Sequence, residues 1–120
     1  MNTLHTGVCF QLTHPPSHPP TVVFDEVDVG IGGGVAEVVG NLLRELGQRG
    51  QVFCVTHLAQ VAAKGDSHLL AQKSFSKSDA TTSITELNTD KRTEELARMM
   101  GGLDVTQSSI AHAAEMLESA

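Results

Sequence analysis

Acidic and polar side chains follow two apolar runs of this 120-residue chain. Residues 22–24 lead directly into Asp25 and Glu26, and residues 52–56 lead into His57. Phosphoryl transfer from a nucleoside triphosphate uses groups of these types: one carboxylate to hold Mg²⁺, a second to position or deprotonate water, and a polar group near the γ-phosphate. If the fold brings the two runs together, these residues would form the metal and water site of a nucleotide hydrolase.

A simpler interpretation of the two acids is also open. Taken alone, an apolar run that ends in Asp25 and Glu26 is more typical of a solvated strand end than of a metal site. The imidazole of His57 at the end of the second run shifts the preference toward a site. The glycine-rich stretch at 30–34 lacks a lysine and follows the acids, so it is predicted as a flexible turn rather than a phosphate-cradling loop.

The residues between the two runs predict the element that connects them. Residues 21–25 are predicted as a short buried strand, because their apolar side chains are consecutive and β-branched or aromatic. Residues 35–46 carry the apolar stripe of an amphipathic helix, and residues 51–56 are predicted as a second buried strand. Such a strand–helix–strand unit has parallel strands, whose carboxyl ends share one sheet edge. The predicted fold class is therefore α/β, with the acids and His57 along that edge.

The remainder of the chain predicts two further strands and three helices. A short helix is expected at 58–64, and strands at 68–75 and 81–87 are expected to pair antiparallel across a polar loop. Asp90 and Thr106 are predicted to cap the two C-terminal helices. The whole fold class is thus a parallel strand–helix–strand core, followed by further strands and two C-terminal helices.

The first 20 residues differ from the rest, because all four prolines lie at 15–20. Proline fixes φ and removes a backbone donor, so residues 1–20 are predicted as a disordered, polyproline-like tail, with the globular part at 21–120. The two cysteines, Cys9 in this tail and Cys54 in an apolar run, are expected to be poorly placed for a bridge and to remain thiols of a cytosolic protein.

Composition narrows the range of partners. The formal net charge is −6 and the chain has no Trp or Tyr, so a strongly basic, base-stacking face for nucleic acid is not expected within it. No apolar run approaches membrane-spanning length, and nothing at the N-terminus suggests secretion. The expectation is a cytoplasmic protein with no membrane partner.

Three segments of the chain resemble a known family. The stretch VVFDEVDVGIGGGVAEVVGNLL is similar to the Walker B and D-loop region of RecN, the bacterial recombinational-repair ATPases related to SMC proteins. QVFCVTHLAQVAAKGDSHLLAQK resembles the H-loop segment that follows it, and RTEELARMMGG resembles the end of that family. The resemblance implies part of a P-loop NTPase of the ABC/SMC head type, acting in repair of DNA double-strand breaks and associated with the nucleoid.

The resemblance also implies roles for individual residues. Asp25 matches the Walker B aspartate that reaches Mg²⁺ through water, and Glu26 matches the catalytic glutamate that polarises the attacking water. His57 matches the H-loop histidine that senses the γ-phosphate. Asp28, Gly30 and Gly32 match the D-loop, which crosses to the opposite nucleotide site in a head dimer.

Other parts of the family pattern are missing. No G-x-x-x-x-G-K-[ST] loop occurs, the signature helix is absent upstream of the Walker B strand, and Gly32 stands where the family usually has Ser. The resemblance therefore implies a C-terminal fragment that uses ATP and Mg²⁺ only when a missing N-terminal lobe or second head completes the site. DNA would be bound through the full-length protein, and the chain is expected to be inactive alone.

Two other function classes remain open. The chain could be a non-catalytic interaction or dimerisation module that associates through an exposed sheet edge, since lost neighbouring strands would leave unpaired backbone groups there. A stand-alone metal phosphohydrolase built on Asp25, Glu26 and Asp28 is the third interpretation, and it requires tight Mg²⁺ or Mn²⁺ binding without nucleotide.

Overall fold

A computed structural model of the chain describes residues 3–11, 21–25, 32–101 and 104–120, with residues 3–11 described as backbone. These residues form one sheet with helices packed on it. In chain order, the elements are β1 (Thr3–Gln11), β2 (Thr21–Asp25), α1 (Gly33–Gly47), β3 (Gln51–Thr56), α2 (Ala59–Ala62), β4 (Ser67–Phe75), β5 (Ala80–Glu86), α3 (Thr89–Gly101) and α4 (Gln107–Glu118).

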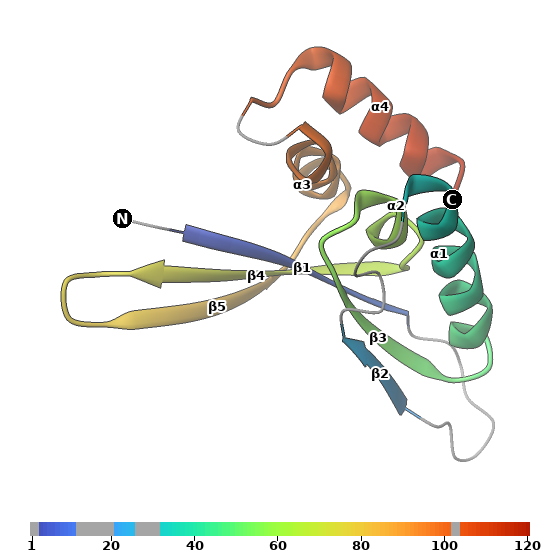
Figure 1. Cartoon of the computed structure of the whole chain (residues 1–120), viewed down its shortest axis with the longest axis horizontal. Helices are drawn as coiled ribbons and strands as arrows, with labels where there is room; N and C mark the ends of the chain where they lie inside the picture. The colour runs from blue at the N-terminus through green and yellow to red at the C-terminus, as the bar shows by residue number, and fades with distance from the viewer. Residues whose placement is uncertain (1–2, 12–20, 26–31, 102–103) are drawn as a thin grey trace.

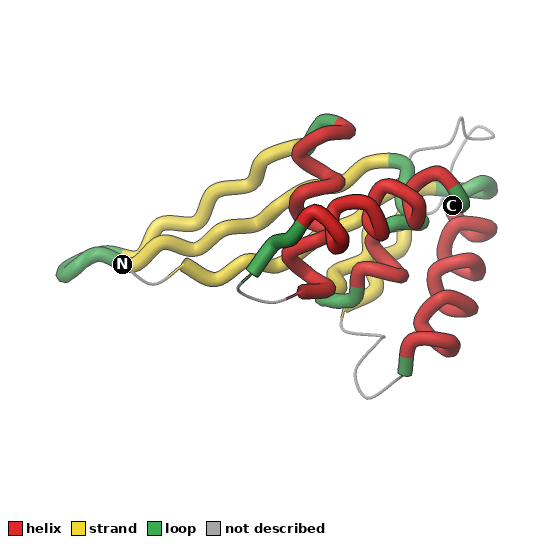
Figure 2. The backbone as a smooth tube through the Cα atoms, turned by 90° about the horizontal axis from the view of Figure 1, so that it is seen from above, coloured by secondary structure: helices red, strands yellow, loops and turns green. Residues whose placement is uncertain are grey.

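The sheet has five strands in the order β2-β3-β1-β4-β5 (Figure 1). β2 pairs parallel with β3, as the strand–helix–strand pattern predicts, and the other neighbouring strands pair antiparallel. The helices lie over one face of the sheet, and the β4–β5 hairpin extends beyond them (Figure 2). Residues of β5 are exposed along its whole length.

The strand β1 is the largest difference from the sequence-based expectation. Residues 3–11 were expected in an extended tail outside the core, yet their backbone pairs antiparallel with both β3 and β4. The prolines that suggested a tail all lie at 15–20, after the strand, so they do not interrupt its hydrogen bonding. Residues 12–20, which complete the predicted tail, lie outside the described residues.

β2 occupies an edge of the sheet, which corrects the prediction that it is fully buried. Val22 and Val23 are 40% and 64% exposed, and only Phe24 of this strand is partly covered. A consecutive apolar run is typical of a strand buried on both faces. In this chain, β2 has a neighbour on one side only, so the run that suggests burial remains open to solvent.

Small residues allow the helices to pack closely. Ala59, Ala62 and Ala63 contact Leu96, Ala97 and Ala113, so α2 forms a core with α3 and α4. Gly40 of α1 provides a second close contact. A Cβ at Gly40 would lie 3.2 Å from the Gln60 carbonyl oxygen and 3.4 Å from the Cα of Val61, so α1 and α2 meet almost backbone to backbone.

Polar contacts fix the start and the orientation of α3. Asn88, rather than the predicted Asp90, caps this helix: its side-chain oxygen accepts from the Lys91 backbone amide at 2.9 Å. Arg92 in the first turn donates to the backbone oxygen of Ala62 at 3.0 Å and to that of Gly65. Because these carbonyls end α2, Arg92 ties the beginning of α3 to the end of α2.

The last helix begins as the sequence predicts. The hydroxyl of Thr106 accepts from the Ser109 backbone amide, and the Ser109 side chain accepts from the Thr106 amide in return. This reciprocal pair satisfies two backbone donors at the start of α4. The prediction that Thr106 caps this helix is confirmed.

His68 of β4 is enclosed between the sheet and α3. Its side chain is completely buried, and neither ring nitrogen has a hydrogen-bond partner among the described residues. Burial, with a smaller contribution from the charge of Arg92, lowers the pKa of His68 from 6.5 to about 4; Glu95 raises it and Arg98 lowers it further. The imidazole is therefore uncharged in the folded chain at neutral pH.

Two glycines of α1 test the contact between α1 and α2. Gly40→Ala should lower the free energy of unfolding by about 1–2 kcal/mol, because the added methyl group meets backbone atoms of α2 and the gain in helix propensity offsets only part of that cost. Gly34→Ala in the same helix is the matched control: its Cβ meets nothing within 4 Å, so it should stabilise by roughly 0.5–1 kcal/mol. Urea unfolding measures both changes, and effects of the same sign would contradict the packing.

His68 should make folding sensitive to acid. Its pKa is lower in the folded state than in the unfolded chain, so only the unfolded chain takes up a proton as the pH falls from 6.5 toward 4. The free energy of unfolding should thus decrease through this window, by up to about 3 kcal/mol. His68→Leu should remove this part of the pH dependence in urea unfolding at pH 7 and near pH 4.5. An unchanged pH dependence in His68→Leu would show that the folded chain holds the imidazole charged.

Candidate nucleotide site

The end of β2, which carries Asp25, lies beside the end of β3, which is followed by His57. Asp25, the last residue of β2, is the Cα partner of Val55, and β3 ends one residue later at Thr56, with His57 next. Because β2 and β3 are parallel neighbours, Asp25 and His57 follow their strands at the same edge of the sheet. Both side chains are exposed there.

Part of the predicted site lies outside the described residues. Glu26, Asp28 and Gly30 fall in the segment 26–31, and their roles stay predictions. Gly32 is the N-cap of α1, with φ −86° and ψ 173°, an extended conformation that any residue adopts. A Cβ there would meet nothing within 4 Å, so the structure has room for the serine that the RecN pattern usually carries at this position.

The turn after β3 holds the backbone around His57. Thr56 is buried, and its hydroxyl accepts a hydrogen bond of 3.0 Å from the backbone amide of Leu58. That bond spans His57 and satisfies an amide at the start of α2, where helices leave donors unpaired. The side chain at position 57 is thereby presented outward from a fixed turn.

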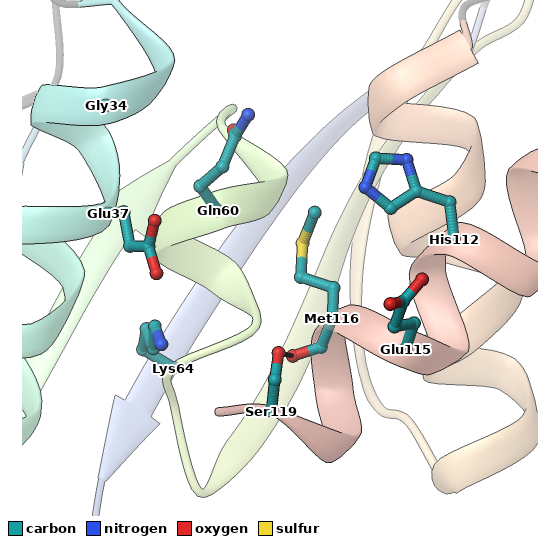
Figure 3. Close-up of a pocket in the computed structure, with 8 residues that line it drawn as sticks. All are labelled: Gly34, Glu37, Gln60, Lys64, His112, Glu115, Met116 and Ser119. Atoms are coloured by element: carbon teal, nitrogen blue, oxygen red, sulfur yellow. Dashed lines mark hydrogen bonds between the residues drawn. The ribbon is translucent and has the colours of Figure 1, made fainter.

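Two adjoining cavities lie beside α2, and His57 lines the first of them. The first, of about 440 Å³, lies between His57, the start of α2, the pair Met99 and Met100 of α3, and His112 of α4. The second, of about 410 Å³, lies between α1, α2 and α4 and shares Gln60 and His112 with the first. Figure 3 shows Glu37 and Lys64 on one side of this second cavity, with Met116, Glu115 and His112 of α4 on the other.

His112 is a cavity-lining residue that the sequence did not point out. It is exposed, and it borders both cavities. The signal was present in the spacing of His112, Glu115 and Ser119, which form one polar face of α4 beside its apolar face. Met99 and Met100 pack against the core cluster of α2, α3 and α4.

No ready-made metal site is visible within the part of the chain that the structure describes. Among those residues, no three His, Cys, Asp or Glu side chains come together as metal ligands. Asp25 is exposed at the strand end. Within the same described residues, no helix is long and apolar enough to cross a membrane.

By its architecture, the chain is an α/β protein whose parallel strand–helix–strand unit brings an acid and an imidazole to one sheet edge. No protein-family profile matches it. Individual relatives are clear, however. The chain is 48% identical to the DNA repair protein RecN of Xylella fastidiosa (strain 9a5c) over 82% of its own length, and 48% identical to that of Vibrio cholerae over 84%. Identity to the DNA repair protein RecN of Haemophilus influenzae is 47% over 89% of the chain.

The chain belongs to the RecN family over this matched part. It spans only about 18% of the length of the first two relatives and 19% of the third. The predicted resemblance to the RecN family is thereby confirmed, whereas the activity of the whole relatives is a matter for proposal.

The hydroxyl of Thr56 offers a test of the turn that carries His57. Thr56→Val keeps the shape of the side chain and removes the acceptor, so the Leu58 amide loses its partner and the free energy of unfolding should fall by about 1–3 kcal/mol. Thr56→Ser keeps the acceptor and should lose less. Urea unfolding of the three proteins decides this, and a Val variant as stable as the parent would show that the bond does not hold the turn.

Proposed function

We propose that the chain is the C-terminal part of a RecN-type ATPase head, which acts in ATP-dependent repair of broken DNA when an N-terminal lobe completes it. Support comes from 47–48% identity to DNA repair proteins over 82–89% of the chain. The structural observation that supports the proposal is the parallel pairing of β2 with β3. In this register Asp25 is the Cα partner of Val55, which lies two residues before His57.

Each predicted site residue has one role in this proposal. Asp25 would hold Mg²⁺ through water, Glu26 would polarise the attacking water, and His57 would donate a hydrogen bond to the γ-phosphate. Asp28, Gly30 and Gly32 form the D-loop that reaches the opposite head. Bound Mg²⁺ would neutralise the charge that develops on the transferred phosphoryl group.

The chain by itself lacks most of what binds a nucleotide. A P-loop NTPase cradles the β- and γ-phosphates with backbone amides and a lysine of the Walker A loop, and the sequence contains no such loop. We therefore place the affinity for Mg²⁺-ATP in the missing N-terminal lobe, and the positioning of water and the sensing of the γ-phosphate in this chain.

Exposed apolar residues on β2 and α1 support the proposal that another unit covers this part of the chain. β2 is an open sheet edge, and the large apolar residues of α1 that point outward are half exposed or more: Val35, Val38, Leu42 and Leu46. Exposed apolar surface next to an unpaired edge is typical of a region that another unit covers. Because the chain spans less than a fifth of its relatives' length, we propose the N-terminal lobe of the same head as that unit.

A chimaera tests the catalytic proposal. The full chain, including β1, replaces the corresponding segment of the Haemophilus influenzae RecN, and ATP hydrolysis is compared with that of the unmodified relative. The chimaera should hydrolyse ATP, and Glu26→Gln within it should lower turnover by roughly 10²–10⁴-fold, the range expected when a general base is lost. The isolated chain should show no Mg²⁺-dependent hydrolysis.

The same chimaera provides the controls. Glu86→Gln changes an exposed acid at the end of β5, on the border of the sheet opposite β2, so it should leave turnover unchanged. An active chimaera in which Glu26→Gln has no effect would overturn the catalytic assignment. Strong hydrolysis by the isolated chain would instead favour a stand-alone phosphohydrolase.

A binding experiment tests the proposed interaction surface on β2 and α1. Val23→Lys and Leu42→Lys should prevent the isolated chain from binding the truncated relative that lacks its own C-terminal segment, as measured by light scattering after size exclusion. Lys is costly to bury in an apolar contact, whereas it is harmless on an exposed surface. Binding that survives both substitutions would place the partner elsewhere on the chain.

A further inference from the structure

Three residues with reactive or titratable side chains occupy one row across the middle of the sheet. In the register of β1, Cys9 is the Cα partner of Cys54 in β3 on one side and of His68 in β4 on the other. Cys9 and Cys54 are the only cysteines of the chain. The expectation that they are poorly placed for a bridge is thus wrong at the level of the backbone, because β1 brings position 9 directly opposite position 54.

The register places the two positions at a separation that a disulfide can span. Directly opposed residues of antiparallel strands have Cα atoms about 4.5 Å or about 5.5 Å apart, depending on whether they exchange backbone hydrogen bonds. Disulfides join Cα atoms that are roughly 4.4–6.8 Å apart. Either type of pair at positions 9 and 54 therefore falls within the range without any movement of the strands.

The surroundings of Cys54 and His68 are those of a protected, water-poor layer. Cys54 is 3% exposed and packs with Ala36 and Val61 beneath α1 and α2. His68 is fully buried, and its ring nitrogens have no hydrogen-bond partner among the described residues. An uncharged imidazole has one nitrogen that can accept a hydrogen bond, and the backbone position of His68 neighbours that of Cys9.

We propose that Cys9 and Cys54 form a reversible disulfide between β1 and β3, a redox modification site that lies apart from the nucleotide site. With hydrogen peroxide as the oxidant, one thiol attacks the peroxide, which gives a sulfenic acid and one water. The second thiol then attacks the sulfenic sulfur, which gives the disulfide and a second water. The thiol proton passes to the departing oxygen, and the uncharged imidazole of His68 offers the thiol a hydrogen-bond acceptor. A dithiol reductant reverses the modification by thiol–disulfide exchange.

The bond would fasten the strand that joins the two halves of the sheet. β1 lies between β3 and β4, so β2–β3 and β4–β5 are connected within the sheet only through residues 3–11. Oxidation would hold these residues in one register against β3. The oxidised chain should therefore resist proteolysis near its N-terminus better than the reduced chain does.

Intact-mass analysis of the folded chain after treatment with hydrogen peroxide tests the proposal. The expected result is a monomer that has lost the mass of two hydrogen atoms, with a Cys9–Cys54 linkage in the non-reducing peptide map. Cys9→Ser should abolish the loss. A folded chain that keeps both thiols, or that forms only covalent dimers, would overturn the proposal.

The double variant Val8→Cys/Cys9→Ser is the matched control. It moves the thiol by one position, opposite Val55 rather than Cys54, and successive residues of a strand lie on opposite faces of the sheet. This variant should not crosslink when folded, yet it should crosslink as well as the parent in denaturant. Equal crosslinking of both proteins in the folded state would overturn the register on which the proposal rests.

His68→Leu tests the imidazole separately. The substitution should slow disulfide formation in the folded chain severalfold and leave its rate in denaturant unchanged. Circular dichroism and urea unfolding first establish that the variant is folded under the assay conditions. Equal rates in the folded parent and variant would show that His68 takes no part in the reaction. The mass measurement tests the disulfide independently of His68.

Discussion

The parallel pairing of β2 with β3 is the constraint on which the rest of the structure depends. A parallel pair needs a crossover, and α1 supplies it on the helical face of the sheet. Since α1 is fixed by both strands, its close approach to α2 at Gly40 in turn fixes where α2 leaves the end of β3. The position of His57 beside Asp25 is thus a consequence of backbone pairing and helix packing, rather than of contacts between the two side chains.

The elements with a clear local signal could be predicted from the sequence. The apolar stripe of 35–46 and the run at 51–56 correspond to α1 and β3, and Thr106 caps α4 through its own hydroxyl. β1 could not be predicted in this way, because an antiparallel central strand is stabilised by neighbours that lie far along the chain. The cap of α3 was predicted two residues too late, since Asn88 and Asp90 are both good caps and only the backbone geometry distinguishes them.

Prediction of the candidate site was limited by a different cause. The edge shared by Asp25 and His57 follows from strand direction, which the pattern of elements reveals. The contribution of His112 does not, because it depends on how α4 packs against α3 and on which of its faces then borders α2. The exposure of Val22 and Val23 could not be predicted either. A run of apolar residues indicates that a surface becomes covered, but it does not identify the segment that covers it.

The two borders of the sheet differ in chemistry. Beyond β2 the border is apolar, whereas β5 at the other border reads ATTSITE, is exposed throughout, and is dominated by hydroxyl side chains and a terminal glutamate. Polar and charged side chains along a border discourage the addition of another strand, and valines do not. The border at β2 therefore has the side chains of an interior strand, whereas the border at β5 has those of a strand that faces solvent.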